Sequence, residues 1–458
     1  MVGGTAGRNG GKARAKGVLP ERGTYENRED SMRGIRLGLV VFAAALLALA
    51  LGGVAYAFHS GGVAECGGCH SMHSPAPGGS YLLAKTDQSS TCLNCHAAND
   101  TAASSYHVMT YPVPAAGVAP VERTPGGDFA WLLKSYTFTV RGSTTNELGE
   151  THGHNTVAAD YGIAVDAVNT TAPGGTFPSA QLSCVSCHDP HGKYRRNSTG
   201  QIVTSGVPIS GSGSYTNSRG NTATNPIPAN LAVGAYRLLA GLGYTKGGVT
   251  YTGVPAAVVP STYNQSEATN QVRTAYGHAT TNGHVAWGTW CATCHTGMHS
   301  SGNYVHPVDE NLGGDIASIY NAYVNSSNTA GGSATSSFLS LVPFVEGSAD
   351  YTLLGSHASN TNGYLNGPVA GDRVSCVSCH RAHASGWEFG LRWNMEGEFI
   401  TVADATGNAI YPGTDNGAPV QFARGRTAAE TQAAYYDRPV SVFGPYQRVL
   451  CNKCHAKD

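Results

Sequence analysis

The stretch Cys184-Val-Ser-Cys187-His188 decides how this chain folds, because its pattern occurs six times. C-x-x-C-H is the attachment signature of c-type haem: the two thiols form thioethers to the porphyrin, and the histidine that follows ligates the iron. The other copies are Cys66-Gly-Gly-Cys69-His70, Cys92-Leu-Asn-Cys95-His96, Cys291-Ala-Thr-Cys294-His295, Cys376-Val-Ser-Cys379-His380 and Cys451-Asn-Lys-Cys454-His455. All 12 cysteines fall in these motifs. The sequence therefore predicts six covalently attached haem c groups.

Three other uses of paired cysteines fit this pattern less well. A zinc site does not need a histidine after every second cysteine. A thioredoxin-like redox pair would occur once, within a βαβ unit. A disulfide framework would leave the six adjacent histidines unexplained. Covalent haem accounts for every paired cysteine and for all six adjacent histidines.

The composition indicates what kind of fold surrounds these motifs. Charged residues make up only 12% of the chain, which has 60 Gly, whereas about 25% charged residues is typical. Such a chain would ordinarily be poorly ordered. We therefore predict mostly irregular coil with short helices and few short strands, wrapped around a chain of six stacked haems. Helices are expected at the motifs, at 316–323 and at 426–435, strands at 136–141 and 248–251, and a surface loop at 204–230.

The N-terminal segment indicates export. Residues 37–54 are uninterrupted apolar residues or Gly, preceded by Arg33 and Arg36 and followed by Ala55-Tyr56-Ala57. This is the order of a signal peptide, with a cleavage site after Ala57. We predict an extension and signal peptide over 1–57 and a single hexahaem unit over 58–458. The alternative is a retained membrane anchor, since a run of this length is near the lower limit for a span.

The charge balance of the predicted mature chain disfavours nucleic acid as a partner. Removing residues 1–57 leaves 20 Lys and Arg against 25 Asp and Glu, a net charge of −5. Haem propionates would add further negative charge. Nucleic-acid binding ordinarily needs the opposite balance.

The remaining histidines decide what the irons can do. His70, His96, His188, His295, His380 and His455 are the predicted first iron ligands, and 12 further histidines remain for the second position. The predicted second ligands are His73, His107, His154, His191, His357 and His383, with His59, His299 and His306 as further candidates. Methionine would also ligate iron, but histidine is in surplus. Two protein ligands leave no iron position for a substrate, which predicts electron transfer and no enzymatic activity.

The spacing of some of these histidines predicts stacked haem pairs. His73, His191 and His383 each lie three residues after a motif histidine, and His299 lies four after His295. Residues three or four apart share one helix face. Such a histidine cannot reach the far side of the iron that its neighbour binds, but it can reach a second haem alongside.

Other candidates are less specific. His154 and His357 precede the third and fifth motifs, as expected for ligands of a haem pair. His107 and His59 compete for one of the first two haems, and His299 and His306 compete for the fourth. Histidines in Gly-, Thr- and Asn-rich surroundings are expected at the surface; they are His152, His278 and His284.

Several runs outside the haem motifs are specific enough to indicate a family. They include Phe58-His-Ser-Gly-Gly-Val-Ala-Glu-Cys66, Ser90-Thr-Cys92, Thr124-Pro-Gly-Gly-Asp-Phe129, Cys187-His-Asp-Pro-His-Gly-Lys-Tyr-Arg-Arg196, Val254-Pro-Ala-Ala-Val-Val-Pro-Ser-Thr-Tyr263 and Pro445-Tyr-Gln-Arg-Val-Leu-Cys451, with the C-terminal Asn-Lys-Cys-His-Ala-Lys-Asp458. Together they span essentially the whole mature chain. It resembles the filament-forming hexahaem outer-surface cytochromes of Geobacter-type bacteria.

The resemblance implies a secreted, extracellular protein that polymerises head to tail. In this family the histidine at the position of His73 ligates the fifth haem of the adjoining subunit, which here would be held by Cys376, Cys379 and His380. A heterologous contact of this kind generates an open polymer. The implied partners are further copies of the chain, outer-membrane electron conduits and extracellular electron acceptors. The chain departs from the family in its surface histidines and in its long N-terminal extension.

Two alternatives stay open at this point. A monomeric periplasmic or secreted multihaem shuttle would share every ligand but bind His73 within its own chain. A multihaem reductase would need one five-coordinate haem, for example through a lysine in place of a motif histidine. None of the six motifs carries such a replacement.

Overall fold

The computed structural model describes residues 66–77, 80–99, 106–190, 195–196, 202–203, 239–260, 264–281, 284–299 and 306–455. These residues belong to one compact unit, whose bounds are Tyr56–Asp458. The predicted signal peptide over 1–57 and the predicted loop over 204–230 lie outside the described residues. Within the described part, no helix combines the length and hydrophobicity that a membrane span requires.

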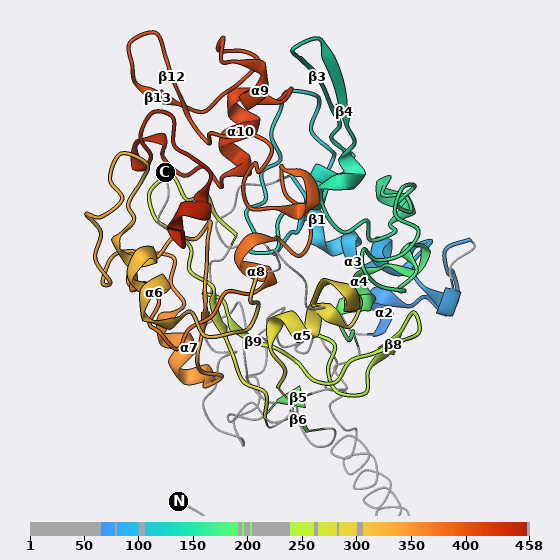
Figure 1. Cartoon of the computed structure of the whole chain (residues 1–458). Helices are drawn as coiled ribbons and strands as arrows, with labels where there is room; N and C mark the ends of the chain where they lie inside the picture. Colours follow the sequence, from blue (N-terminus) through green and yellow to red (C-terminus); the bar gives the residue numbers. More distant parts are fainter. Residues whose placement is uncertain are drawn as a thin grey trace, which may run out of the picture. The chain divides into compact units, whose positions relative to one another are not determined.

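The helices are short and are separated by long stretches of coil (Figure 1). The α-helices are α2 (Cys66–Cys69), α3 (Gln88–His96), α4 (Cys184–Cys187), α5 (Trp287–Ala292), α6 (Gly313–Ala322), α7 (Tyr351–His357), α8 (Cys376–Cys379), α9 (Val420–Ala423) and α10 (Ala428–Ala434). The 3-10 helices are η1 (Ser80–Leu82), η2 (Phe129–Leu133), η3 (Gly149–His152), η4 (Ala159–Tyr161), η5 (Ser179–Gln181), η8 (Thr296–His299), η9 (Glu388–Gly390), η10 (Val440–Val442) and η11 (Leu450–Lys453).

The strands are shorter still. They are β1 (Ala97–Ala98), β2 (Met109–Thr110), β3 (Tyr136–Val140), β4 (Ser143–Glu147), β5 (Arg195–Arg196), β6 (Ile202–Val203), β7 (Thr245–Lys246), β8 (Val249–Thr250), β9 (Ala256–Val258), β10 (Ala275–Gly277), β11 (Val345–Glu346), β12 (Val402–Ala403) and β13 (Ala409–Ile410). One sheet has three strands, in which β10 pairs antiparallel with β9 and parallel with β11. The described chain is therefore mostly coil, which confirms the predicted fold class.

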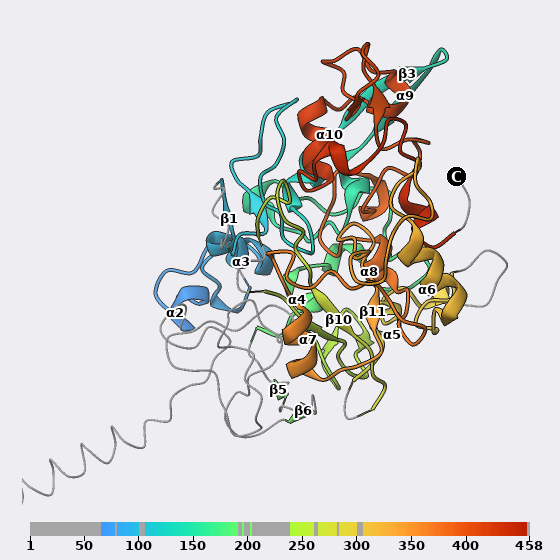
Figure 2. The ribbon, with the colours of Figure 1, turned by 90° about the vertical axis from the view of Figure 1, so that its left-hand side faces the viewer.

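The longest hairpin of the described residues, β3–β4, follows from local sequence. Its first strand alternates buried and exposed residues, as a half-buried strand should. Arg141 and Gly142 form the turn at φ values of 51° and 82°, and a two-residue hairpin turn of type I′ needs positive φ at both positions. The strand β3 contacts α9, and the two lie side by side in Figure 1 and Figure 2.

The elements predicted from sequence are present, with shifted ends. The strands expected at 136–141 and 248–251 appear as β3 and β8, and the helices expected at 316–323 and 426–435 appear as α6 and α10. A capping box between Thr427 and Glu430 starts α10. The two C-V-S-C helices, α4 and α8, are capped in the same way by Ser183 and Ser375.

Aromatic side chains dominate the apolar core around the motifs. The larger cluster includes Trp131, Trp387 and Tyr435, and Cys379 and Cys454 pack against it. Cys187 and Cys291 pack against a second cluster, which is built around the tryptophans of α5. These four predicted attachment cysteines thus lie at the edges of the core.

Candidate haem-binding site

The six motifs lie next to one another in the order of the chain. Helix α3 contacts α4, and α5 contacts α8 (Figure 1). The thiol of Cys92 is hydrogen-bonded to that of Cys184, and the thiol of Cys291 to that of Cys376. At the remaining steps one thiol lies close enough to raise the pKa of a thiol of the neighbouring motif: Cys69 raises the pKa of Cys92, Cys294 that of Cys187 and Cys454 that of Cys379. The attachment sites therefore form an unbroken run from the first motif to the last.

Four motif histidines share one hydrogen-bond arrangement, in which Nδ1 donates to a backbone carbonyl. The pairs are His70 with Tyr81 (2.9 Å), His96 with Tyr106 (2.9 Å), His295 with Pro173 (2.9 Å) and His380 with Phe389 (2.8 Å). A metal-ligating histidine almost always donates its other ring N–H in this way. The bond fixes the tautomer and leaves Nε2 as the ligand atom. These residues therefore fit a haem iron.

The carbonyls at the first and fifth motifs come from residues in an unusual backbone conformation. Tyr81 and Phe389 have φ values of 57° and 60°, which non-glycine residues adopt rarely and mostly at functional sites. In both cases the chain then forms a β-bridge back to the motif histidine, through Leu83 and Leu391. The third motif has the same bridge, through Leu239. Sequence reasoning missed these supports, because nothing in their local residue pattern marks them.

Two motif histidines face a second imidazole. The ring centres of His154 and His295 are 6.0 Å apart with an interplanar angle of 57°, and those of His306 and His455 are 6.3 Å apart at 63°. Metal–nitrogen bonds of about 2 Å and the size of the ring place two imidazoles that share one iron about 6 Å apart, centre to centre. Both pairs have this separation. The sequence offers His306 for the fourth motif, whereas its ring faces His455 of the sixth motif and that of His154 faces His295 of the fourth.

His154 is held ready for this role by the backbone. Its Nδ1 donates to the carbonyl of Ala382 at 2.7 Å. Burial, with the nearby charge of His295, lowers the pKa of His154 to about 4. The ring is therefore neutral at pH 7, as a metal ligand must be.

His383 and His107 lie near other motifs. Burial lowers the pKa of His383 to about 3, and His188 is the charged neighbour with the largest further effect. The ring of His383 stacks on Phe129, with centres 4.6 Å apart. Burial also lowers the pKa of His96, and the charge of His107 adds to that shift. His383 thus lies at the third motif and His107 at the second.

Of the other predicted second ligands, His73 and His357 are not brought to a motif histidine within the described residues. The side chain of His73 is exposed, and His299 lies in η8. Nδ1 of His357 lies 2.6 Å from Oε2 of Glu346, and its ring stacks on Tyr364. His59 and His191 lie outside the described residues.

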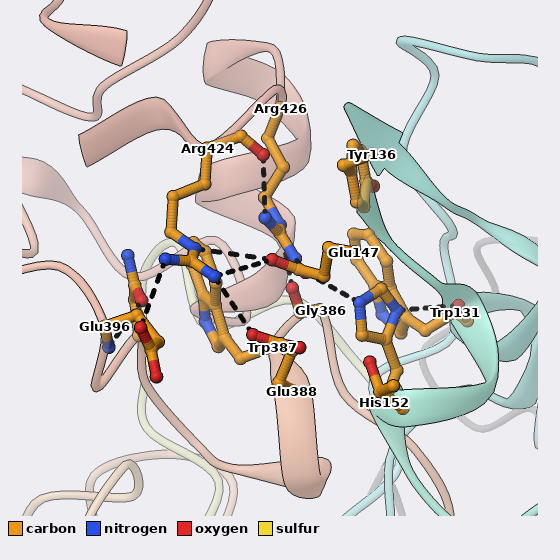
Figure 3. Close-up of polar contacts among 12 residues, drawn as sticks. Trp131, Tyr136, Glu147, His152, Gly386, Trp387, Glu388, Glu396, Arg424 and Arg426 are labelled. Atoms are coloured by element: carbon orange, nitrogen blue, oxygen red, sulfur yellow. Dashed lines mark hydrogen bonds and ion pairs between the residues drawn. The ribbon is translucent and has the colours of Figure 1, made fainter. Parts of the chain in front are cut away.

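Two histidines expected at the surface are buried instead. His152 is 0% exposed and His284 is 4% exposed. His152 donates from Nδ1 to the carbonyl of Trp131 at 2.9 Å and from Nε2 to Glu147 at 2.8 Å (Figure 3). Both ring nitrogens are engaged, so His152 is a structural residue. A Gly- and Thr-rich neighbourhood predicts exposure only where the chain is a surface loop, and here coil makes up the interior.

Comparison with known proteins gives one family. No family model matches the chain. It is 50% identical over 450 residues to the C-type cytochrome OmcS of Geobacter sulfurreducens, which covers 93% of this chain and 100% of the relative. Two solved structures are similar: the OmcS nanowires of the same organism, with a TM-score of 0.76 and 48% identity, and the outer membrane cytochrome S filament, with a TM-score of 0.75 and 49% identity. Each comparison covers 88% of this chain and 100% of the solved chain.

Proposed function

Since the chain belongs to the family of the C-type cytochrome OmcS, we propose that it passes electrons along six bis-histidine haems and polymerises head to tail into a conductive extracellular filament. It is a multihaem c-type cytochrome of the outer-surface, filament-forming kind, and its cofactors are six covalent haem c groups. The observation that carries the proposal is the unbroken run of six attachment sites in chain order.

Each haem would be held by thioethers to the cysteines of one motif and by the motif histidine. The thiols are Cys66, Cys69, Cys92, Cys95, Cys184, Cys187, Cys291, Cys294, Cys376, Cys379, Cys451 and Cys454. We assign His107, His383, His154 and His306 as second ligands of the second, third, fourth and sixth haems. His59, which the sequence offers for one of the first two haems, is the candidate for the first.

The fifth haem would take its second ligand from another copy. None of the four second ligands assigned above, among the described residues, is placed at His380, and the side chain of His73 is exposed. If His73 ligates the fifth haem of the adjoining subunit, that haem gains its second ligand and the exposed His73 gains a role at the interface. The ligand bond is then part of the interface, and the contact is heterologous, so the polymer stays open.

The same ligation argues against enzymatic activity. An iron with two protein ligands offers no position to a substrate, so the haems carry electrons. We propose outer-membrane electron conduits as the source and extracellular acceptors as the destination. Residues 58–458 would act as one hexahaem unit after removal of the signal peptide.

The test is electron microscopy of the secreted protein together with a haem count by absorbance. The His73→Ala chain should keep six haems and lose filaments. His278→Ala is the matched control, since His278 is half-buried and pairs with no motif histidine among the described residues; its filaments should be normal. Unaltered filaments of the His73→Ala chain would overturn the bond between subunits, and single subunits of the unmodified chain at high concentration would favour the shuttle.

A further inference from the structure

Three backbone segments cross beside His154 and His383. They are residues 126–127, 152–154 and 382–385, together called the ligand junction below. His154 N donates to the carbonyl of His383 at 2.8 Å, and His383 N donates to that of Gly126 at 2.7 Å. Ala384 forms β-bridges with both Gly127 and Gly153. The two histidines therefore lie on neighbouring backbone segments, although their rings lie near different motifs.

The crossing depends on glycine. A Cβ on Gly153 would overlap the carbonyl oxygen of His383 and lie 2.7 Å from the Cα of Ala384. A Cβ on Gly127 would overlap the carbonyl oxygen of Ala384, and its φ of 97° disfavours other residues as well. The obstructing atoms are backbone, so they cannot move aside as a flexible side chain would. A larger residue must push the strands apart.

A buried carboxylate ties two of these strands together from the other side. Glu147, at the end of β4, accepts from Nε2 of His152 and pairs with Arg426 and Arg424 (Figure 3). Arg426 in turn donates from Nε to the carbonyl of Gly386 at 2.8 Å. Through His152 and Arg426, one carboxylate thereby connects the segment just before His154 with the segment just after His383.

We propose that Gly153 and Glu147 are positioning residues that set the ligation of the third and fourth haems. Gly153 allows the backbone segments of the ligand junction to approach each other, and Glu147 holds them in position. This inference rests on the proposed function, in which His154 and His295 ligate the iron of the fourth haem and His383 and His188 that of the third. Displacement of a ligand by about 1 Å is half the length of a metal–nitrogen bond of about 2 Å, and functional constellations need positioning to about 0.5 Å. Small shifts of the junction therefore release a ligand.

The experiment compares Gly153→Ala with Gly314→Ala. Gly314 lies in α6 with nothing within 4 Å of an added Cβ, so its substitution is a matched control. Filaments of both chains are assayed for haem content, for spin state by electron paramagnetic resonance of the oxidised protein, and for binding of carbon monoxide by the chemically reduced protein. We expect Gly153→Ala to keep six haems, to show a high-spin signal and to bind about one carbon monoxide per chain at a haem freed of its second ligand. Added imidazole should restore the low-spin signal. Gly314→Ala should stay low-spin.

The outcomes separate this inference from the proposed function. High-spin iron or fewer than six haems per chain in filaments of the unmodified chain would overturn the proposed function itself. A low-spin Gly153→Ala chain that binds no carbon monoxide, beside a low-spin unmodified chain, would overturn only the role of Gly153. If Gly153→Ala does not mature, Glu147→Gln decides: a partly high-spin chain rescued by imidazole supports the inference, and an unchanged low-spin chain overturns it.

Discussion

Replacing Glu147 with glutamine should destabilise the folded chain by about 3 kcal/mol at pH 7, since breaking a buried ion pair by removing one partner costs about 3 to 5 kcal/mol. The side chain of Glu147 is 1% exposed, and that of Arg426 is 0% exposed. Arg426 also lies over the rings of Tyr136 and Trp387, at 4.1 and 4.4 Å. The substitution therefore leaves a guanidinium buried without its main counter-charge.

The lowered pKa of Glu147 leads to the same size of stability loss. Burial alone would raise it, but the hydrogen bond from His152 and the charge of Arg426 lower the pKa from 4.5 to about 2. A shift of this size corresponds to about 3 kcal/mol, at about 1.4 kcal/mol per pKa unit. The folded-state pKa is below the unfolded one, so the contribution is fully present above pH 4.5 and is lost as the pH falls toward 2. At pH 3 about half of it should remain.

The assay is guanidinium unfolding followed by far-ultraviolet circular dichroism, at one fixed chain concentration because assembly adds concentration-dependent stability. Glu398→Gln is the control: Glu398 pairs with Arg448 at 2.8 Å, but their side chains are 55% and 41% exposed, so the loss should be at most about 1 kcal/mol. The reasoning is wrong if the two variants lose equal stability, or if the deficit of Glu147→Gln is the same at pH 7 and pH 3.

Three further outcomes follow from the geometry. His306→Ala should leave the sixth haem five-coordinate and able to bind carbon monoxide, whereas His278→Ala should bind none; a low-spin His306→Ala chain would contradict the assigned pair. Leu354→Ala, at a side chain 0% exposed, should lower the free energy of unfolding by about 2 to 5 kcal/mol, and Val369→Ala, at one 65% exposed, by at most about 0.5 kcal/mol. The Cys294→Ala chain should hold the haem of the fourth motif by one thioether, so the pyridine haemochrome band should broaden to longer wavelength. An unchanged band would mean that Cys294 does not hold that haem.

The sequence predicts the attachment sites and the coil-rich fold because both depend on local patterns. C-x-x-C-H needs only five adjacent residues, and β3 and α10 follow from short alternating or capped stretches. The second ligands depend on long-range packing instead. His306 reaches His455 across most of the C-terminal third of the chain, and no periodicity reports such a contact. His152 was expected at the surface for the same reason: its burial is set by the distant Arg424 and Arg426 around Glu147, which local composition does not show.

The same long-range pairs explain how a chain of this composition can be ordered at all. Under the proposed ligation, the iron between His154 and His295 closes a loop of about 140 residues, and that between His306 and His455 closes one of similar length. In the chain-entropy model a cross-link around a loop of about 100 residues removes unfolded-state entropy worth about 4 to 5 kcal/mol. Short helices and two-stranded sheets could not supply a stabilisation of this size by themselves. Each haem with both ligands from one chain therefore adds a cross-link as well as apolar surface, and the ligand junction, where His154 and His383 meet, joins two of those cross-links through one set of backbone hydrogen bonds.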